Sequence, residues 1–276
     1  TVATEAIGHH TLVPLASYLG FQLEGLPIDR EGILPQALEE ACKRGNIRAV
    51  FVQPSAISPT ATLMGEERRA ALVAVARKHD IAIIENDILG PLVRRSAPPI
   101  AALAPERTFY VTSFTKVTLP GLRIGYLVSP DRFVAAVANR HLVSNWMATP
   151  LMAEIATRWV QDGTATELVD WQRQAIHKRH AIATEVLAQS QFWSQPESLH
   201  IWLDLPKGQA EETFVAQARL QGVAIAPGAS FKVADAFRTP AVRLSLGSTS
   251  EEELRTGLGV VAKLLMADPE HLLLAI

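Results

Sequence analysis

Short apolar, β-prone runs alternate with helical patterns along the first half of the chain. The strand candidates are residues 2–6, 21–28, 49–53, 81–84, 108–111 and 124–128, and the helix candidates are residues 12–19, 34–44 and 65–79. In the second helix candidate, Leu34, Leu38 and Ala41 recur at the spacing of an amphipathic helix. Strands that alternate with helices predict right-handed crossovers and a mostly parallel sheet covered by helices on both faces.

The second half of the chain has a different pattern. Long helical segments are expected at residues 132–143, 151–161 and 165–188. They are followed by strand candidates at 200–205, 223–226 and 241–246 and by helix candidates at 211–221 and 251–265. This order predicts a large α/β domain over residues 1–150, then connecting helices and a small α+β domain over residues 151–276.

Composition narrows the class of protein. Apolar residues make up 48% and charged residues 20% of the chain, and the net charge of -2 offers no electrostatic footprint for nucleic acid or for an anionic membrane. A single cysteine, Cys42, excludes a disulfide framework and favours a cytoplasmic location. No apolar run reaches the roughly 18 residues needed to cross a bilayer. The chain starts without an initiator Met or signal-peptide features, so we expect that the beginning of the natural protein is missing.

One lysine and one arginine lie between the last two strand candidates of the first half. Lys116 follows a hydroxyl-rich segment, and Arg123 follows a Pro-Gly turn. Serine and threonine hydroxyls together with an arginine fork can hold a phosphate, and a lysine amine can form an imine with an aldehyde. The alternative is that Lys116 is simply solvated.

Asp87 closes the strand candidate at 81–84. A carboxylate at the carboxyl end of a buried parallel strand is either a helix cap or the partner of a buried cation. If a protonated ring nitrogen lies beside Asp87, the carboxylate stabilises the positive charge of that nitrogen. Because ligands bind at the carboxyl ends of strands in such sheets, Asp87 and Lys116 are expected in one site.

Four motifs occur in an order that resembles one family. They are residues 54–61 (PSAISPTA), 85–87 (END), 113–126 (SFTKVTLPGLRIGY) and 241–245 (AVRLS). The order resembles the pyridoxal phosphate (PLP) enzymes of fold type I, the class I/II aminotransferases. The similarity is greatest to the aminotransferase-like domain of MocR-type regulators in the GntR superfamily, and it covers nearly the whole chain.

The resemblance implies a cofactor, a fold and a role for each motif residue. The fold would be the PLP-dependent transferase fold of type I. Lys116 would form the Schiff base with PLP and later move the substrate proton, and Asp87 would pair with the pyridine nitrogen. Ser113, Thr115 and Arg123 would contact the phosphate. Arg243 would bind a substrate carboxylate with its fork, the alternative being a surface arginine on a strand.

The chain departs from the family pattern at three places. Where the family usually reads Asn-Pro-Thr-Gly, residues 58–61 read Ser-Pro-Thr-Ala, so Ser58 stands in place of the asparagine that contacts the O3′ atom of the cofactor. The resemblance implies that Ser58 is a cofactor-binding residue whose shorter hydroxyl still reaches O3′, the alternative being that it binds water. Leu89 and Gly90 stand where a tyrosine commonly makes a second O3′ contact. Upstream of residue 1, the resemblance would place a phosphate-binding turn, an aromatic residue that stacks on the ring and, in regulators, a winged-helix domain.

Three functions are compatible with these features. The first is a PLP-binding domain that senses a small amino compound in a homodimeric regulator and reaches DNA only through a winged-helix domain absent from this chain. The second is an active aminotransferase, and the third is a scaffold domain that no longer binds cofactor. No metal site is expected, because His177, His180 and His200 lack a third ligand nearby in the sequence.

Overall fold

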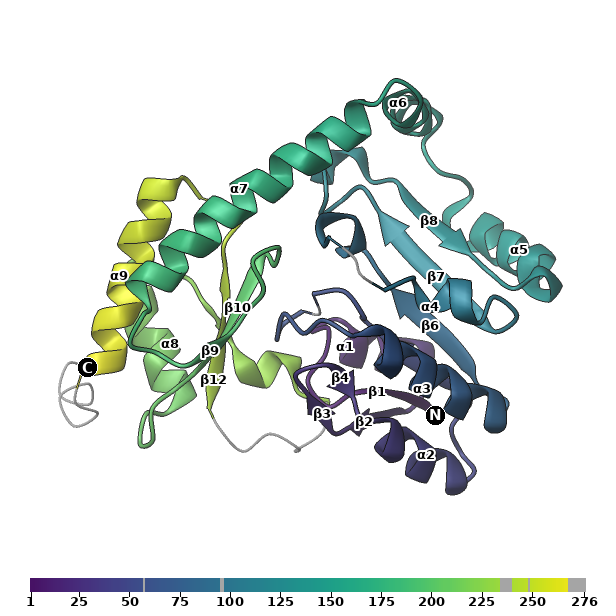
Figure 1. Cartoon of the computed structure of the whole chain (residues 1–276), viewed down its shortest axis with the longest axis horizontal. Coiled ribbons are helices and arrows are strands. Elements are labelled where there is room, and N and C mark those ends of the chain that lie inside the picture. The colour runs from purple at the N-terminus through teal and green to yellow at the C-terminus, as the bar shows by residue number, and fades with distance from the viewer. Residues whose placement is uncertain (57, 95–96, 234–239, 248, 268–276) are drawn as a thin grey trace.

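The structure is a computed structural model that describes residues 1–56, 58–94, 97–233, 240–247 and 249–267. Ile57, which belongs to one of the motifs, lies outside these ranges. The described residues form a six-stranded and a four-stranded sheet, which are joined by a long helix, and a two-stranded hairpin (Figure 1).

The larger sheet has six strands in the order β2-β1-β5-β6-β7-β8. Their bounds are β1 (Val2–Glu5), β2 (Leu23–Leu26), β5 (Ala49–Val52), β6 (Ala82–Asn86), β7 (Thr108–Ser113) and β8 (Gly125–Val128). Neighbouring strands pair in parallel except β7 and β8, which are antiparallel. The mostly parallel sheet is therefore confirmed. Because β6 and β7 are adjacent and parallel, Asp87 and the segment after Ser113 emerge at the same edge.

One face of this sheet is packed by helices. The helices of this part are α1 (Leu12–Leu19), α2 (Pro35–Lys43), α3 (Glu66–Lys78) and the short α4 (Ile100–Leu103). Leu38 from α2 and Leu72 from α3 join Val50 and Ile83 from the sheet in one buried core. The edge strand β8 differs, since all of its residues are exposed.

Two strand boundaries differ from those expected. The expected strand at 21–28 is interrupted at Pro27, which has no N–H to donate to a ladder. Beyond it, β3 (Ile28–Asp29) and β4 (Gly32–Ile33) form a separate hairpin. Strand β6 extends two residues further than expected, because Glu85 and Asn86 pair with Tyr110 and Val111.

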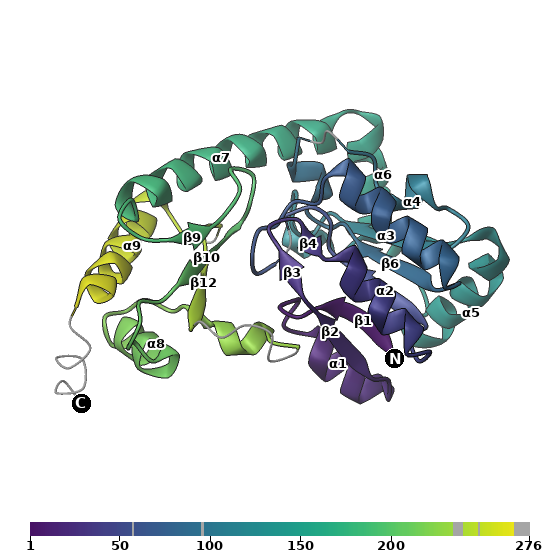
Figure 2. The ribbon, with the colours of Figure 1, turned by 60° about the horizontal axis from the view of Figure 1, so that its bottom comes forward.

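The long helices lead from the large sheet to the small one (Figure 2). They are α5 (Val134–Asn145), α6 (Pro150–Gln161) and α7 (Thr164–Val186). Helix α7 is tied to both parts: Arg173 donates to the carbonyl of Leu92 at 3.1 Å, and Arg179 donates to that of Leu246 at 2.9 Å. The arginines of this polar helix therefore join the two parts of the chain.

The smaller sheet is antiparallel, in the order β11-β12-β10-β9. Its strands are β9 (Phe192–Trp193), β10 (His200–Asp204), β11 (Ala226–Pro227) and β12 (Ala241–Ser245), with helices α8 (Glu211–Leu220) and α9 (Glu251–Met266). The strand expected at 223–226 is instead the shorter β11, and Val223 and Ile225 pack against the core of this part. The domain boundary near residue 150 stays a prediction.

Short 3-10 turns complete the described structure. They are η1 (Gly90–Leu92), η2 (Pro120–Leu122), η3 (Asp131–Phe133) and η4 (Gly228–Phe231). None of the helices within the described ranges is both long and apolar enough to cross a membrane.

Candidate functional site

Lys116 lies on a turn directly after β7. The turn is held by Phe114, whose N–H donates to the carbonyl of Ile124 at 3.1 Å and whose carbonyl accepts from the N–H of Thr118 at 3.0 Å. Phe114 and Leu122 are buried, whereas Lys116 is exposed. The turn is thus anchored by apolar side chains and leaves the amine of Lys116 accessible to a ligand.

Asp87 is fully buried at the end of β6. Its Oδ2 accepts a hydrogen bond from the hydroxyl of Tyr110 at 3.0 Å, and its N–H donates to the carbonyl of Val111 at 2.8 Å. The nearby turn η1 begins after Leu89 rather than after Asp87. Asp87 is therefore not the cap of this turn. Its position favours the other interpretation, in which Asp87 is the partner of a cation.

The side chains expected to contact phosphate lie together. Ser113, Thr115 and Arg123 all line a hollow of about 1250 Å³ between β7, β8 and α5. Arg123 adopts a left-handed backbone conformation, with φ of 53°, at the end of η2. Two hydroxyls and a guanidinium in one hollow form a donor set that suits a phosphate.

Arg243 is placed by β12 and contacts Ser58, a residue far away in the sequence. Its Nη1 donates to Oγ of Ser58 at 3.4 Å, and its Cζ lies 4.8 Å from the centroid of the Phe231 ring. The Nε atom is buried and has no hydrogen-bond partner among the described residues. Burial lowers the pKa of the guanidinium from its usual value. Arg243 is therefore not a fully solvated surface arginine, because its guanidinium is partly buried and contacts Ser58 and the Phe231 ring.

Three histidines share the electrostatic environment of Lys116 and Arg243. Burial, together with the nearby positive charges of Arg243 and Lys116, lowers the pKa of His9 to about 4 and that of His200 to about 3. The pKa of His10 is lowered by burial, by Arg243 and by Lys116. These shared effects show that Lys116 and Arg243 lie near the same histidines, although Lys116 follows β7 of the large sheet and Arg243 lies on β12 of the small sheet. The sequence did not indicate that these histidines belong to the site.

Tyr110 is a second residue of the site that sequence reasoning missed. Tyr110→Phe is expected to lower the free energy of unfolding by about 1–3 kcal/mol, because a buried carboxylate oxygen of Asp87 loses its donor. Urea denaturation at pH 7 measures the change. Tyr126→Phe is the control, since Tyr126 is 45% exposed on β8. Equal stability of the two variants would contradict a role for Tyr110 in holding Asp87.

Glu5, at the end of β1, is a fully buried acid. Its Oε1 accepts from the N–H of Gln53 at 3.2 Å and its Oε2 from the hydroxyl of Thr4 at 3.0 Å. Burial nevertheless raises the pKa of Glu5 to about 7, because desolvation outweighs these hydrogen bonds.

The raised pKa of Glu5 predicts a pH-dependent stability. The folded state binds the Glu5 proton more tightly than the unfolded state, so the wild type loses stability as pH rises from the unfolded pKa of 4.5 through about 7. Relative to Glu5→Gln, the wild type should lose about 3 kcal/mol between pH 5 and pH 8. Urea denaturation at both pH values measures this, with the exposed Glu67→Gln as control. A pH-independent difference would exclude a protonated Glu5.

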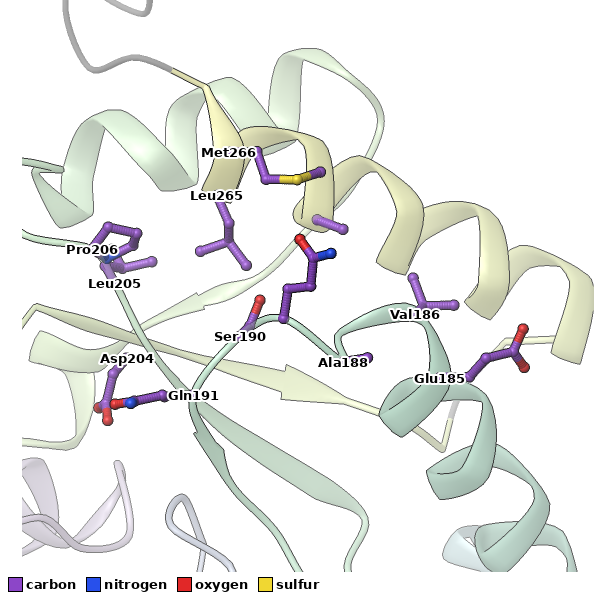
Figure 3. A pocket seen from close by; sticks show the side chains of 12 residues that line it. Glu185, Val186, Ala188, Ser190, Gln191, Asp204, Leu205, Pro206, Leu265 and Met266 are labelled. Carbon is purple, nitrogen blue, oxygen red and sulfur yellow. The ribbon is translucent and has the colours of Figure 1, made fainter.

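A separate pocket lies in the small part of the chain (Figure 3). It has a volume of about 740 Å³ and lies between the ends of α7, β10 and α9, with Asp204 and Gln191 among its polar lining residues. None of the residues expected to bind PLP lines it. Within the described ranges, no group of three or more His, Cys, Asp or Glu side chains could hold a metal ion.

The side chains at the strand ends fit PLP. An accessible lysine amine suits the aldehyde, a fully buried carboxylate suits a protonated ring nitrogen, and the hydroxyl–guanidinium hollow suits the phosphate. The family comparison agrees with this donor set. The model of the family "Aminotransferase class I and II" matches residues 18–261. The chain belongs to this family.

Curated relatives in this family include both regulators and enzymes. The chain is 26% identical over 263 residues to the uncharacterized HTH-type transcriptional regulator YdeF of Bacillus subtilis, covering 94% of this chain and 57% of the regulator. It is 27% identical over 252 residues to aromatic-amino-acid aminotransferase 1 of Thermococcus litoralis, covering 86% of this chain and 60% of the enzyme. The chain thus spans less than two thirds of either relative.

A solved structure supports the fold. The α-aminoadipate aminotransferase LysN of Thermus thermophilus, in complex with N-(5'-phosphopyridoxyl)-L-leucine, superimposes with a TM-score of 0.89. The match has 22% sequence identity and covers 100% of this chain and 72% of LysN. The predicted fold is confirmed, and membership of this family implies PLP as the cofactor. The roles of the individual site residues stay predictions.

Proposed function

We propose that the chain is a PLP-binding domain that senses a small amino compound within a MocR-type regulator of the GntR family. The observation that carries this proposal is the contact between Arg243 and Ser58. The Ser58 hydroxyl, which replaces the family's asparagine, accepts a hydrogen bond from Arg243 and so orients the guanidinium for a carboxylate. Leu89, at the second departure, is buried in an apolar cluster. The site thus keeps groups that bind an amino acid while its expected contacts to O3′ are altered.

The chain's own residues have distinct tasks in this proposal. Bound PLP withdraws electrons from the α-carbon of an attached amino compound. Lys116 holds the cofactor and moves a proton, and Asp87 keeps the ring nitrogen charged. Ser113, Thr115 and Arg123 hold the phosphate. The similarity to the regulator YdeF supports a regulatory function. In this proposal a winged-helix domain outside these residues contacts DNA.

The alternative is an active aminotransferase that transfers an amino group between an amino acid and a 2-oxo acid. Two observations favour an active enzyme. The chain retains Lys116, Asp87 and Arg243, and it is similar to the Thermococcus litoralis aminotransferase. One experiment separates the two. The chain is incubated with PLP, titrated with amino acids while its absorbance spectrum is followed, and then supplied with 2-oxoglutarate. A spectral response without turnover supports the sensor, sustained turnover supports the enzyme, and a colourless protein rejects both.

We further propose that the chain forms a homodimer. Several large apolar side chains are exposed between β8 and α7, namely Tyr126, Leu127, Val128, Leu142, Val143, Trp146, Met147, Leu151, Val160 and Trp171. Such a concentration of exposed apolar residues is typical of an interaction surface. Light scattering tests the proposal, and a monomer would contradict it. The cytoplasmic location stays a prediction.

A further inference from the structure

The pocket of Figure 3 lies where two helices and a strand of the small part end. Helix α7 ends at Val186, α9 ends at Met266 and β10 ends at Asp204, and all three residues line the pocket. Its volume of about 740 Å³ falls within the range of roughly 300–1,000 Å³ that is typical of small-molecule sites. The pocket is therefore large enough for a ligand, and its lining decides which kind.

The ionisable side chains that line this pocket are both acids. They are Glu185 and Asp204, and no lysine, arginine or histidine is among the described lining residues. The Glu185 carboxylate is paired with Arg255 at 2.8 Å. The half-buried Asp204 carboxylate forms no hydrogen bond or ion pair with a described residue. An anionic ligand would be repelled here, whereas a cation would gain an unpaired partner.

Asp204 is desolvated and has other acceptors beside it. Burial raises the pKa of Asp204, and the positive charge of Arg30 opposes this effect. Gln191 is the next residue in the pairing of β9 with β10, and its carbonyl accepts from the Asp204 N–H at 3.4 Å. Ser190, which precedes it, also lines the pocket. A carboxylate, an amide oxygen and a hydroxyl together provide acceptors for the three N–H donors of an ammonium group.

The ends of the two helices favour a cation independently of these side chains. The macrodipole of a helix places roughly half an elementary negative charge at its C-terminal end. The last turn of α7 contains no basic residue that would compensate this charge. The last turn of α9 contains Lys263, but its side chain is exposed and does not line the pocket. The pocket therefore lies in a negative field from both helices.

The rest of the lining is apolar. Val186, Ala262 and Leu265 pack against the core of the small part, and Met266 is 69% exposed at the rim. A metal ion has no use for such a wall, and no group of three or more His, Cys, Asp or Glu among the described residues could hold one. An acidic end beside an apolar wall suits an organic cation with a hydrocarbon body.

We propose that this pocket binds a primary alkylammonium ion, with the ammonium group at Asp204 and the alkyl chain along Val186, Leu265 and Met266. The amine binds intact, because Lys116 and the other residues assigned to the cofactor do not line the pocket. The inference goes beyond the proposed function, since it gives the chain a second site for an amine that requires neither PLP nor an imine.

The test compares three probes that share one alkyl chain and differ only in the head group: hexylammonium, 1-hexanol and hexanoate. Their binding to the whole chain without PLP is measured by calorimetry at pH 7. Asp204→Asn removes the charge at constant shape, and Met266→Ala shortens the apolar wall. The matched controls are Asp80→Asn, whose side chain is 89% exposed, and Met147→Ala, which is 54% exposed in the large apolar surface. Urea denaturation checks that each variant is folded.

The wild type should bind hexylammonium at least about tenfold more tightly than 1-hexanol, and hexanoate should bind most weakly. Asp204→Asn should reduce hexylammonium affinity to that of 1-hexanol and leave 1-hexanol binding unchanged. Met266→Ala should weaken both probes by a similar factor, because it removes apolar contact that both share. The two control variants should bind all three probes as the wild type does.

Equal affinity of the wild type for hexylammonium and 1-hexanol would overturn the inference, as would the absence of measurable hexylammonium binding. An unchanged preference in Asp204→Asn, or an equal loss in Asp80→Asn, would show that the ammonium group is not bound at Asp204. Failure of the proposed function has a different signature, because the chain would then remain colourless with PLP whatever the result with hexylammonium.

Discussion

Lys116→Ala is expected to abolish the visible absorbance that the chain gains on incubation with PLP. Lys116 is exposed on the turn after β7, where its amine is free to react with the cofactor's aldehyde. Without the amine, PLP can be held only by non-covalent contacts of residues such as Asp87 and Arg123. Any transamination should fall by about 10²–10⁴-fold, the range for losing a positioned acid–base group.

The measurement combines absorbance with mass spectrometry after borohydride reduction, which makes a lysine-bound cofactor permanent. The wild type should carry the reduced adduct on Lys116. Lys178→Ala, on the exposed side of α7, is the matched control and should carry the same adduct. An adduct that persists in Lys116→Ala would show that another lysine binds the cofactor.

Features that depend on local sequence were predictable. The helix α1 has the bounds expected from its pattern, and strands β5 and β7 begin at the expected residues, because apolar periodicity reports directly on burial. Asp87 and Lys116 could be assigned to one edge because parallel strands bring their carboxyl ends together. The pairing of β8 as an antiparallel edge strand was not predicted from its composition.

The contacts that complete the site join residues far apart in the sequence. Ser58 and Arg243 are 185 positions apart, and the bond between Asp87 and Tyr110 crosses from β6 to β7. Periodicity places such residues on elements but does not state which side chains meet.

A buried arginine, Arg69, supports the loop that carries Ser58. Arg69 lies on α3 and is 1% exposed. Its Nε donates to the carbonyl of Met64 at 3.0 Å, and its Nη1 donates to that of Pro98 at 3.0 Å. Its Nη2 donates to the carbonyl of Pro54 at 3.4 Å, and Nη1 lies 3.9 Å from the fully buried Glu85. One guanidinium therefore holds both ends of residues 54–64 and compensates a buried acid.

Arg69→Met is expected to lower the free energy of unfolding by about 3–5 kcal/mol, because it leaves the buried Glu85 without its cation and buried carbonyls without a donor. Urea denaturation at pH 7 measures the loss. Arg255→Met is the control, since both side chains of its ion pair with Glu185 are exposed and solvent screening leaves the pair little effect on stability.

The double variant Arg69→Met with Glu85→Gln identifies the source of the loss. If the uncompensated acid dominates, removing it should restore part of the stability lost in Arg69→Met. If the carbonyls of residues 54–64 dominate, the double variant should be no more stable than Arg69→Met alone. In that case Arg69 acts mainly by holding the segment that carries Ser58, through the carbonyls of Pro54 and Met64. A change below about 1 kcal/mol in Arg69→Met would mean that the loop is held by its own packing and not by the arginine.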